Sequence, residues 1–103
     1  MNKAELFKTN CSIPTLGEHW RKRVALITGT AEVQLTPKEF GQLTALKKHL
    51  KTETVDVVNW VLDNWSRFSE EAIRGGPYTA PSTPHIGFFL KHHYVALLMM
   101  GLA

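Results

Sequence analysis

The sequence predicts an all-α protein, a single domain (residues 1–103) built as a bundle of four to five helices. Apolar residues recur at helical spacing along most of the chain, and Gly and Pro residues separate these segments. No stretch alternates apolar and polar residues for long enough to predict a strand. A chain of 103 residues that is 44% hydrophobic and 20% charged has the length and composition of one globular domain.

The first elements are an N-terminal arm and a helix. Residues 1–14 are expected to form the arm, and Thr15 with Glu18 matches a capping box that opens the helix. The helix is expected to run to about Thr28, where Gly29 ends it. Its apolar face consists of Leu16, Trp20, Val24 and Ile27.

The clearest helix start of the chain comes next. Thr36 is expected to be the N-cap, Pro37 occupies the first helical position and Glu39 completes a capping box. The apolar residues that recur at helical spacing after it are Phe40, Leu43, Leu46 and Leu50.

A long helix is predicted from Thr52 or Thr54 to about Arg74. Glycines and a proline follow it and end it, and residues 75–84 form a Gly/Pro-rich loop that must be extended through much of its length. The apolar face of the long helix consists of Val58, Val61, Leu62, Trp65, Phe68 and Ala72.

The last helix is the most apolar segment, and Thr83 and Pro84 are expected to open it as N-cap and first helical residue. Nearly every residue from 86 to 102 is apolar, and such a helix must be covered by protein on all sides. We therefore expect it to be central and the most buried element, or to contact a second copy of the chain in a homodimer. Its apolar girdle consists of Phe89, Leu90, Val95, Leu97 and Leu98.

Charge and targeting signals indicate a cytoplasmic protein. The net charge of +3 permits contact with nucleic acid or with an acidic protein surface. The single Cys11 excludes an internal disulfide and a cysteine-based zinc site, and the first eight residues lack the apolar core of a signal peptide. The last helix is near the minimum length of a membrane span, but Lys91 at mid-bilayer would cost about 2.5–3.5 kcal/mol, so we expect no membrane association.

Basic residues on two helices form the candidate nucleic-acid-binding surface. Three consecutive positive charges follow Trp20 and can contact phosphates beside an aromatic ring, while the lysines of the next helix are placed for backbone contact. The candidate residues are Arg21, Lys22, Arg23, Lys38, Lys47, Lys48 and Lys51. The alternative is a solvated helix face, with Trp20 in the core.

Residues 36–65 also allow a helix-turn-helix interpretation, in which the second helix would read DNA bases. The carboxylates of Asp56 and Asp63 would repel phosphate, and the length of the second helix is more typical of a bundle, so we favour the bundle. The side chains left to reach base edges would be Asn59, Asn64 and Arg67.

A second candidate surface is a protein interface. Exposed aromatic and Met side chains are frequent in such interfaces, and the candidate residues are Trp60, Tyr94, Met99 and Met100. The alternative for Trp60 is a boundary position packed under the Pro-rich loop.

No catalytic or metal motif stands out in the chain. The histidines at 85, 92 and 93 have no carboxylate or Cys at ligand spacing, so a helix cap and core-edge positions are the expected roles. No Ser-His-Asp arrangement, carboxylate pair or phosphate-binding glycine loop is present. We expect no enzymatic activity, no cofactor and no small-molecule substrate.

Three segments of the chain, LTPKEFGQL, WVLDNWSRF and PHIGFFLKHHYVALLMM, resemble a helical module of small proteins from bacteriophages and other bacterial mobile elements. The resemblance spans about residues 16–100 and includes Trp20. It implies a phage or mobile-element origin, location in the cytoplasm of the bacterial host, and a role in replication or another DNA transaction. It carries over no catalytic residue.

The expected function is that of a small, non-enzymatic accessory protein that binds DNA, or a DNA-processing complex of replication type, through its basic helix faces. The main alternative is a protein-binding inhibitor or adaptor that docks on a host nucleoprotein machine, for example an anti-defence protein.

Overall fold

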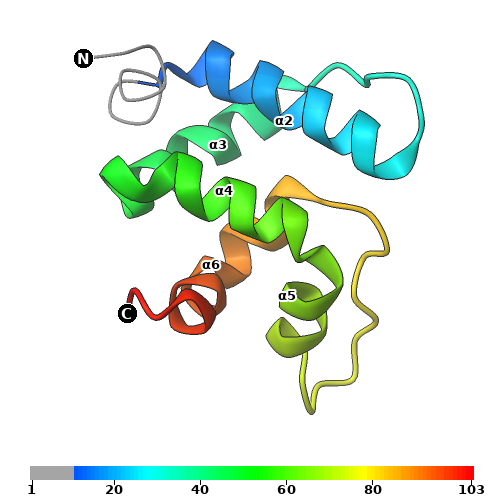
Figure 1. Ribbon diagram of the computed structural model, residues 1–103, viewed down its shortest axis with the longest axis vertical. Coiled ribbons are helices and arrows are strands. Elements are labelled where there is room, and N and C mark those ends of the chain that lie inside the picture. Colours follow the sequence, from blue (N-terminus) through cyan, green and yellow to red (C-terminus); the bar gives the residue numbers. More distant parts are fainter. Residues whose placement is uncertain (1–10) are drawn as a thin grey trace.

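The computed structural model describes residues 11–103, and all regular structure in this range is helical (Figure 1). The elements are α2 (Ile13–Thr28), α3 (Pro37–Leu50), the 3-10 helix η1 (Lys51–Glu53), α4 (Thr54–Asp63), α5 (Trp65–Ala72) and α6 (Ile86–Met100). The predicted all-α, single-domain bundle of four to five helices is confirmed. Most of the predicted N-terminal arm, residues 1–10, lies outside the described residues.

Local capping signals set two of the helix ends as predicted. The backbone N–H of Glu39 donates to the Thr36 hydroxyl at 3.2 Å, and the Thr36 N–H donates to the Glu39 carboxylate at 3.0 Å. This capping box fixes the start of α3. At the end of α2, Gly29 adopts a φ of 69°, which a residue without a side chain tolerates, and its N–H bonds to the Ala25 carbonyl.

The predicted start of α2 at Thr15 is wrong. The helix begins at Ile13, because Ser12 is the N-cap and its hydroxyl accepts a hydrogen bond from the Thr15 N–H at 3.3 Å. Ser is a better N-cap than Thr, and Pro14 fits in the first helical turn, so the earlier residue caps the helix. The carboxylate of Glu18 pairs with Lys22 instead of completing a capping box.

The start of α6 also differs from the prediction at Thr83 and Pro84. His85 is the N-cap, and its Nδ1 accepts a hydrogen bond from the Phe88 N–H at 3.0 Å. Upstream, the Trp65 indole N–H donates to the Pro81 carbonyl at 2.8 Å, which ties the connecting segment to α5. The imidazole thus supplies the cap that the sequence analysis assigned to Thr83.

The predicted long helix is broken at Asn64. Its backbone (φ −125°, ψ 33°) is not helical, and α4 and α5 run in different directions on either side of it (Figure 1). The Asn64 side chain donates to the Trp60 carbonyl at 2.9 Å. A short amide side chain that bonds to nearby backbone in this way competes with regular helical hydrogen bonding.

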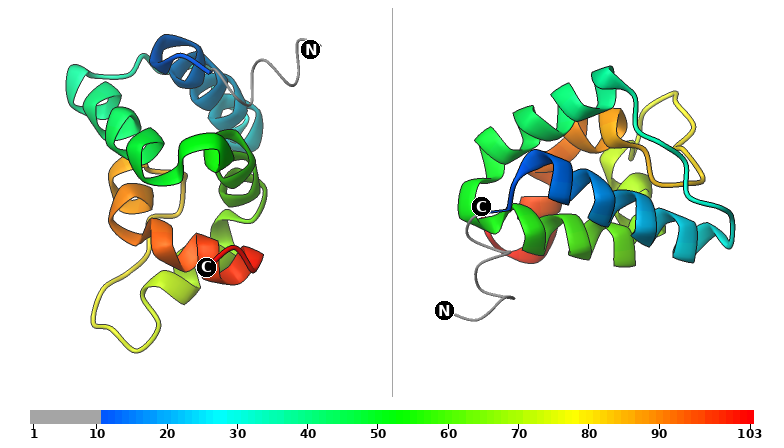
Figure 2. Two further views of the ribbon diagram at one scale, coloured as in Figure 1. Left: turned by 90° about the vertical axis from the view of Figure 1, so that its left-hand side faces the viewer. Right: turned by 90° about the horizontal axis from the view of Figure 1, so that it is seen from above.

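The helix at the centre of the fold is α4, which contacts α2, α3, α5 and α6 (Figures 1 and 2). Six of its ten residues are buried, against four of the fifteen residues of α6. The expectation that the C-terminal helix is the most buried element is therefore wrong, although α6 does contact α3, α4 and α5.

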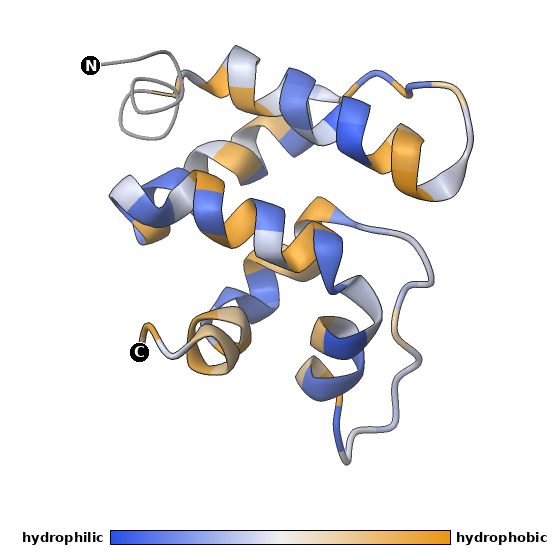
Figure 3. Cartoon of the chain, in the orientation of Figure 1, coloured by the Kyte–Doolittle hydropathy of each residue, from blue (hydrophilic) through white to orange (hydrophobic). Residues whose placement is uncertain are grey.

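The apolar girdle predicted for α6 is only partly covered. Phe89 and Val95 are buried, Leu90 and Leu97 are half-buried, and Leu98 is 62% exposed. Apolar residues continue to the end of the helix (Figure 3), where fewer neighbouring elements are available to cover them.

Helix α2 lies against both α3 and α4. A Cβ atom at Gly17 would lie 2.7 Å from the Phe40 ring, so the missing side chain permits the close approach to α3. Toward α4, His19 Nε2 and Asn59 Oδ1 lie 2.6 Å apart. The apolar face predicted for α2 is buried at Leu16 and Trp20, half-buried at Val24 and exposed at Ile27.

A cluster of aromatic rings joins α2, α5 and α6 in the core. Phe89 stacks on Trp20 with ring centroids 6.1 Å apart and meets the edge of Phe68 at 5.8 Å. The adjacent Phe88 contacts Trp65 at 5.7 Å and Phe68 at 6.1 Å. These contacts hold the first turn of α6 against both α2 and α5.

Burial predicts very different costs for one substitution at two leucines. Leu43→Ala removes a fully buried side chain and is expected to lower the free energy of unfolding by about 2–5 kcal/mol. Leu98→Ala, at an exposed position, should change it by no more than about 0.5 kcal/mol. Chemical denaturation measures both, and equal losses would contradict the assignment of core and surface.

The backbone at Lys51 predicts a stabilising substitution. Its φ of 52° is a conformation that glycine adopts without steric cost, so Lys51→Gly is expected to raise stability by about 1 kcal/mol. Lys48→Gly is the matched control and should lower stability by about 1 kcal/mol, because Lys48 lies within α3. If both variants melt below the parent protein, the backbone strain assigned to Lys51 is absent.

Candidate nucleic-acid interface

The three consecutive positive charges of α2 do not form one basic face, because successive residues of a helix point about 100° apart. Lys22 forms an ion pair with Glu18 at 2.7 Å, which lowers the pKa of that carboxyl group. Arg23 pairs with Asp63 of α4. Arg21 lines a hollow of about 190 Å³ beside the α2–α3 connection.

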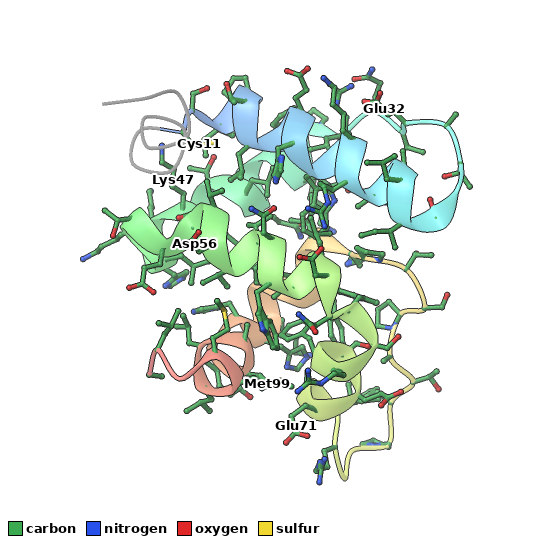
Figure 4. All side chains as sticks on the ribbon, in the orientation of Figure 1. Cys11, Glu32, Lys47, Asp56, Glu71 and Met99 are labelled. Carbon is green, nitrogen blue, oxygen red and sulfur yellow. The ribbon has the colours of Figure 1, made fainter. Side chains whose placement is uncertain are left out.

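The lysines of α3 and η1 do not gather on one surface either. Lys47 is half-buried and donates to the backbone carbonyl of Cys11, so it fastens α3 to the start of α2 (Figure 4). Lys48, Lys51 and Lys38 are exposed, and none of them has an ion pair among residues 11–103. Lys38 lies at the opposite end of α3 from the other two.

Two of the three side chains that the helix-turn-helix interpretation leaves for base edges are engaged within the protein, whereas Arg67 is exposed on α5. Asn59 bonds to His19, and Asn64 bonds to the Trp60 carbonyl. Asp56 and Asp63 remain on the exposed side of α4. A helix with occupied amides and exposed carboxylates is poorly suited to enter a DNA groove, so these contacts favour the bundle interpretation.

The predicted protein-interface residues also differ in their exposure. Tyr94 is 54% exposed, whereas Trp60, Met99 and Met100 are partly buried and pack against the core. The exposed apolar residue one turn from Tyr94 on α6 is Leu98, which was not singled out as an interface residue. The i, i+4 spacing of Tyr94 and Leu98 was visible in the sequence, but the side of α6 left uncovered was not.

A groove between α6 and the segment that follows α5 has no counterpart in the sequence predictions. It has a volume of about 420 Å³, within the range of ligand-binding clefts. Side chains from three places in the chain line it, among them Ile73, Arg74, Tyr78, Phe88, Lys91 and His92. The sequence feature that comes closest to indicating this groove is Tyr78, the aromatic residue of the Gly/Pro-rich loop.

Cationic and aromatic side chains line the groove. Tyr78 is 74% exposed, and Lys91 Nζ lies 6.0 Å from the centroid of its ring. Arg74 is also at the groove and pairs with Glu71 at 2.7 Å, which leaves Lys91 as the cation without an acidic partner among the described residues. Within residues 11–103, no Asp or Glu lines the groove.

His92 forms the inner part of the groove wall and interrupts α6. Its backbone (φ −115°, ψ 19°) departs from helical geometry, and its ring lies 4.6 Å from that of Phe88. Nδ1 is buried without a hydrogen-bond partner in the described part of the chain. Burial, aided by the charge of Lys91, lowers the pKa of the imidazole, so the ring is neutral at pH 7.

The remaining histidines have the structural roles expected for them. His85 caps α6, and His93 stacks on His49 with ring centroids 4.6 Å apart. Between residues 11 and 103, no group of three or more His, Cys, Asp or Glu side chains is arranged to hold a metal ion. In the same range, no helix combines the length and apolar character needed to cross a bilayer.

No family model, curated protein or solved structure matches this chain. The candidate site therefore has to be interpreted from its own geometry.

The lowered pKa of His92 predicts a loss of stability in acid. In the unfolded chain this histidine titrates near 6.5, and below that pH the unfolded state binds the additional proton more readily than the folded state. Replacing it, as in His92→Phe, keeps the ring beside Phe88 and removes the titration. The melting temperature of the variant minus that of the parent protein should therefore increase as the pH falls from about 7.5 to 5.5. A constant difference across this range would mean that the imidazole titrates equally in both states.

Proposed function

We propose that this protein is a small, non-enzymatic accessory protein that binds nucleic acid through the phosphate backbone. The observation that carries the proposal is the pair of exposed cations at the end of α3, Lys48 and Lys51, which have no acidic partner among residues 11–103. Lys38 and Arg21 add charge elsewhere on α3 and α2. Lysines in such positions bind phosphates and carry little base information, so binding should depend weakly on sequence.

The distribution of charge along the chain supports the same proposal. Helices α4 and α5 hold four carboxylates and one arginine, whereas no Asp or Glu follows Glu71. Helix α3 and η1 together carry four lysines and two glutamates. A polyanion is therefore attracted to the α3 end and to the α6 side, and repelled by the outer face of α4 and α5.

The resemblance to phage and mobile-element modules supplies the proposed setting. In that setting the protein works in the cytoplasm of a bacterial host, on DNA or on a DNA-processing complex such as a replication assembly. The likeness lies in scaffold positions, so the origin and the replication context rest on it alone.

Removing the two free lysines tests phosphate binding. The Lys48→Ala/Lys51→Ala variant should bind unrelated DNA sequences more weakly to about the same extent, and the log–log salt slope should flatten by about 0.9 for each lost phosphate contact. Arg67→Ala, which removes an exposed cation on the acidic α5, is the control and should leave the slope unchanged. Fluorescence anisotropy across a salt series measures both. An unchanged slope in the double variant, or no binding by the parent protein at low salt, would end the proposal.

The second candidate function is docking on a protein partner, as an inhibitor or adaptor. The exposed stripe of Tyr94 and Leu98 on α6 favours it, because exposed apolar side chains are frequent in interfaces. Leu98→Lys should then abolish capture of a specific host protein, or concentration-dependent self-association in sedimentation, and leave folding intact. If Leu98→Lys changes neither, the stripe is not an interface.

A further inference from the structure

We propose that the groove between α6 and the α5–α6 connection holds an unpaired nucleobase of a single-stranded nucleic acid, with a neighbouring phosphate on Lys91. This inference rests on the proposed function and specifies its ligand. The groove belongs to a part of the chain that the predicted basic surface does not include.

The size and walls of the groove fit a planar ligand. Its volume of about 420 Å³ is that of a small-molecule cleft, and aromatic side chains stand on two of its elements. Phe88 is held in the core cluster by Trp65 and Phe68, so one wall is rigid before any ligand arrives. Bases stack on such rings with little sequence preference, because every base presents a flat face.

Tyr78 is the second stacking surface, and the connection that carries it is tied to α5 three residues further on. The hydrogen bond from the Trp65 indole to the Pro81 carbonyl holds the connection against α5. The Tyr78 ring is nevertheless 74% exposed, so it retains a free surface for a base even with Lys91 Nζ 6.0 Å from its centroid.

Charge favours a nucleic acid over an apolar peptide as the occupant. Lys91 is exposed beside the rings, Arg74 lines the groove with Glu71 as its partner, and no carboxylate of the described part of the chain lines it. A hydrophobic peptide side chain would use the rings and gain nothing from the ammonium group. A nucleotide uses both, since its base stacks while its phosphate meets Lys91.

The two tyrosines of the chain provide a matched pair of variants. The probe is a labelled single-stranded oligo(dT) of about twelve nucleotides, titrated at low salt with the full chain and followed by anisotropy. Tyr78→Ala should weaken binding about tenfold, from the stacking contribution of one aromatic ring. Tyr78→Phe keeps the ring, and Tyr94→Ala removes an exposed tyrosine that does not line the groove, so both should stay within about twofold of the parent protein. Circular dichroism checks that each variant is folded.

An abasic oligonucleotide of equal length, used as a competitor, separates stacking from phosphate contact. The proposal expects it to compete about tenfold less well than unlabelled oligo(dT) against the parent protein and equally well against Tyr78→Ala. If Tyr78→Ala binds oligo(dT) like the parent protein, or if the abasic strand competes as well as oligo(dT), the groove does not hold a base. In that case duplex binding that still responds to Lys48 and Lys51 leaves the proposed function standing. If the parent protein binds neither duplex nor single strand, both proposals fail.

Discussion

Two adjacent phenylalanines in the first turn of α6 pack against different neighbouring elements, and the arrangement of the helices depends on these ring contacts. Phe89 is fully buried between α2 and α5, where it meets Trp20 and Phe68. Phe88 contacts Trp65, and the indole of Trp65 in turn fixes the connection between α5 and α6 through its hydrogen bond. Three helices and a long irregular segment therefore depend on one aromatic cluster. The cluster brings α2 to α6 and positions the connecting segment, while α2 is also held by α3 and α4.

The same cluster joins the core to the candidate binding surface. Its outer members, Phe88 and the neighbouring His92, form a wall of the groove that Tyr78 and Lys91 complete. A stacking surface built on core residues loses little conformational freedom when a ligand binds, which is how preorganisation favours affinity. In the proposed function, the exposed lysines at the end of α3 would complement this groove with a sequence-independent contact to phosphate. The acidic outer face of α4 and α5 limits the directions from which a polyanion can approach.

Some local capping signals were predictable from the sequence, whereas choices between competing local signals, and features that depend on distant contacts, were not. The capping box at Thr36 involves neighbouring residues and forms as expected, as does the glycine end of α2. The break at Asn64 was missed because its amide bonds to the backbone one turn earlier, a choice that helical periodicity does not reveal. Basic candidates such as Arg23 turned out to be engaged by residues about forty positions away, which no local pattern indicates. The groove was missed because its walls come from segments that meet only in the folded chain.

Titration of the isotopically labelled protein with unlabelled oligo(dT), followed by NMR chemical shifts, tests whether the face built on the aromatic core binds single-stranded nucleic acid as proposed. The largest shifts are expected on the ring and amide signals of Tyr78 and Phe88 and on the amide signal of Lys91, with smaller shifts at Lys48 and Lys51 and none on the outer face of α4. Shifts confined to Tyr94 and Leu98, or a spectrum that does not change, would contradict the proposed binding.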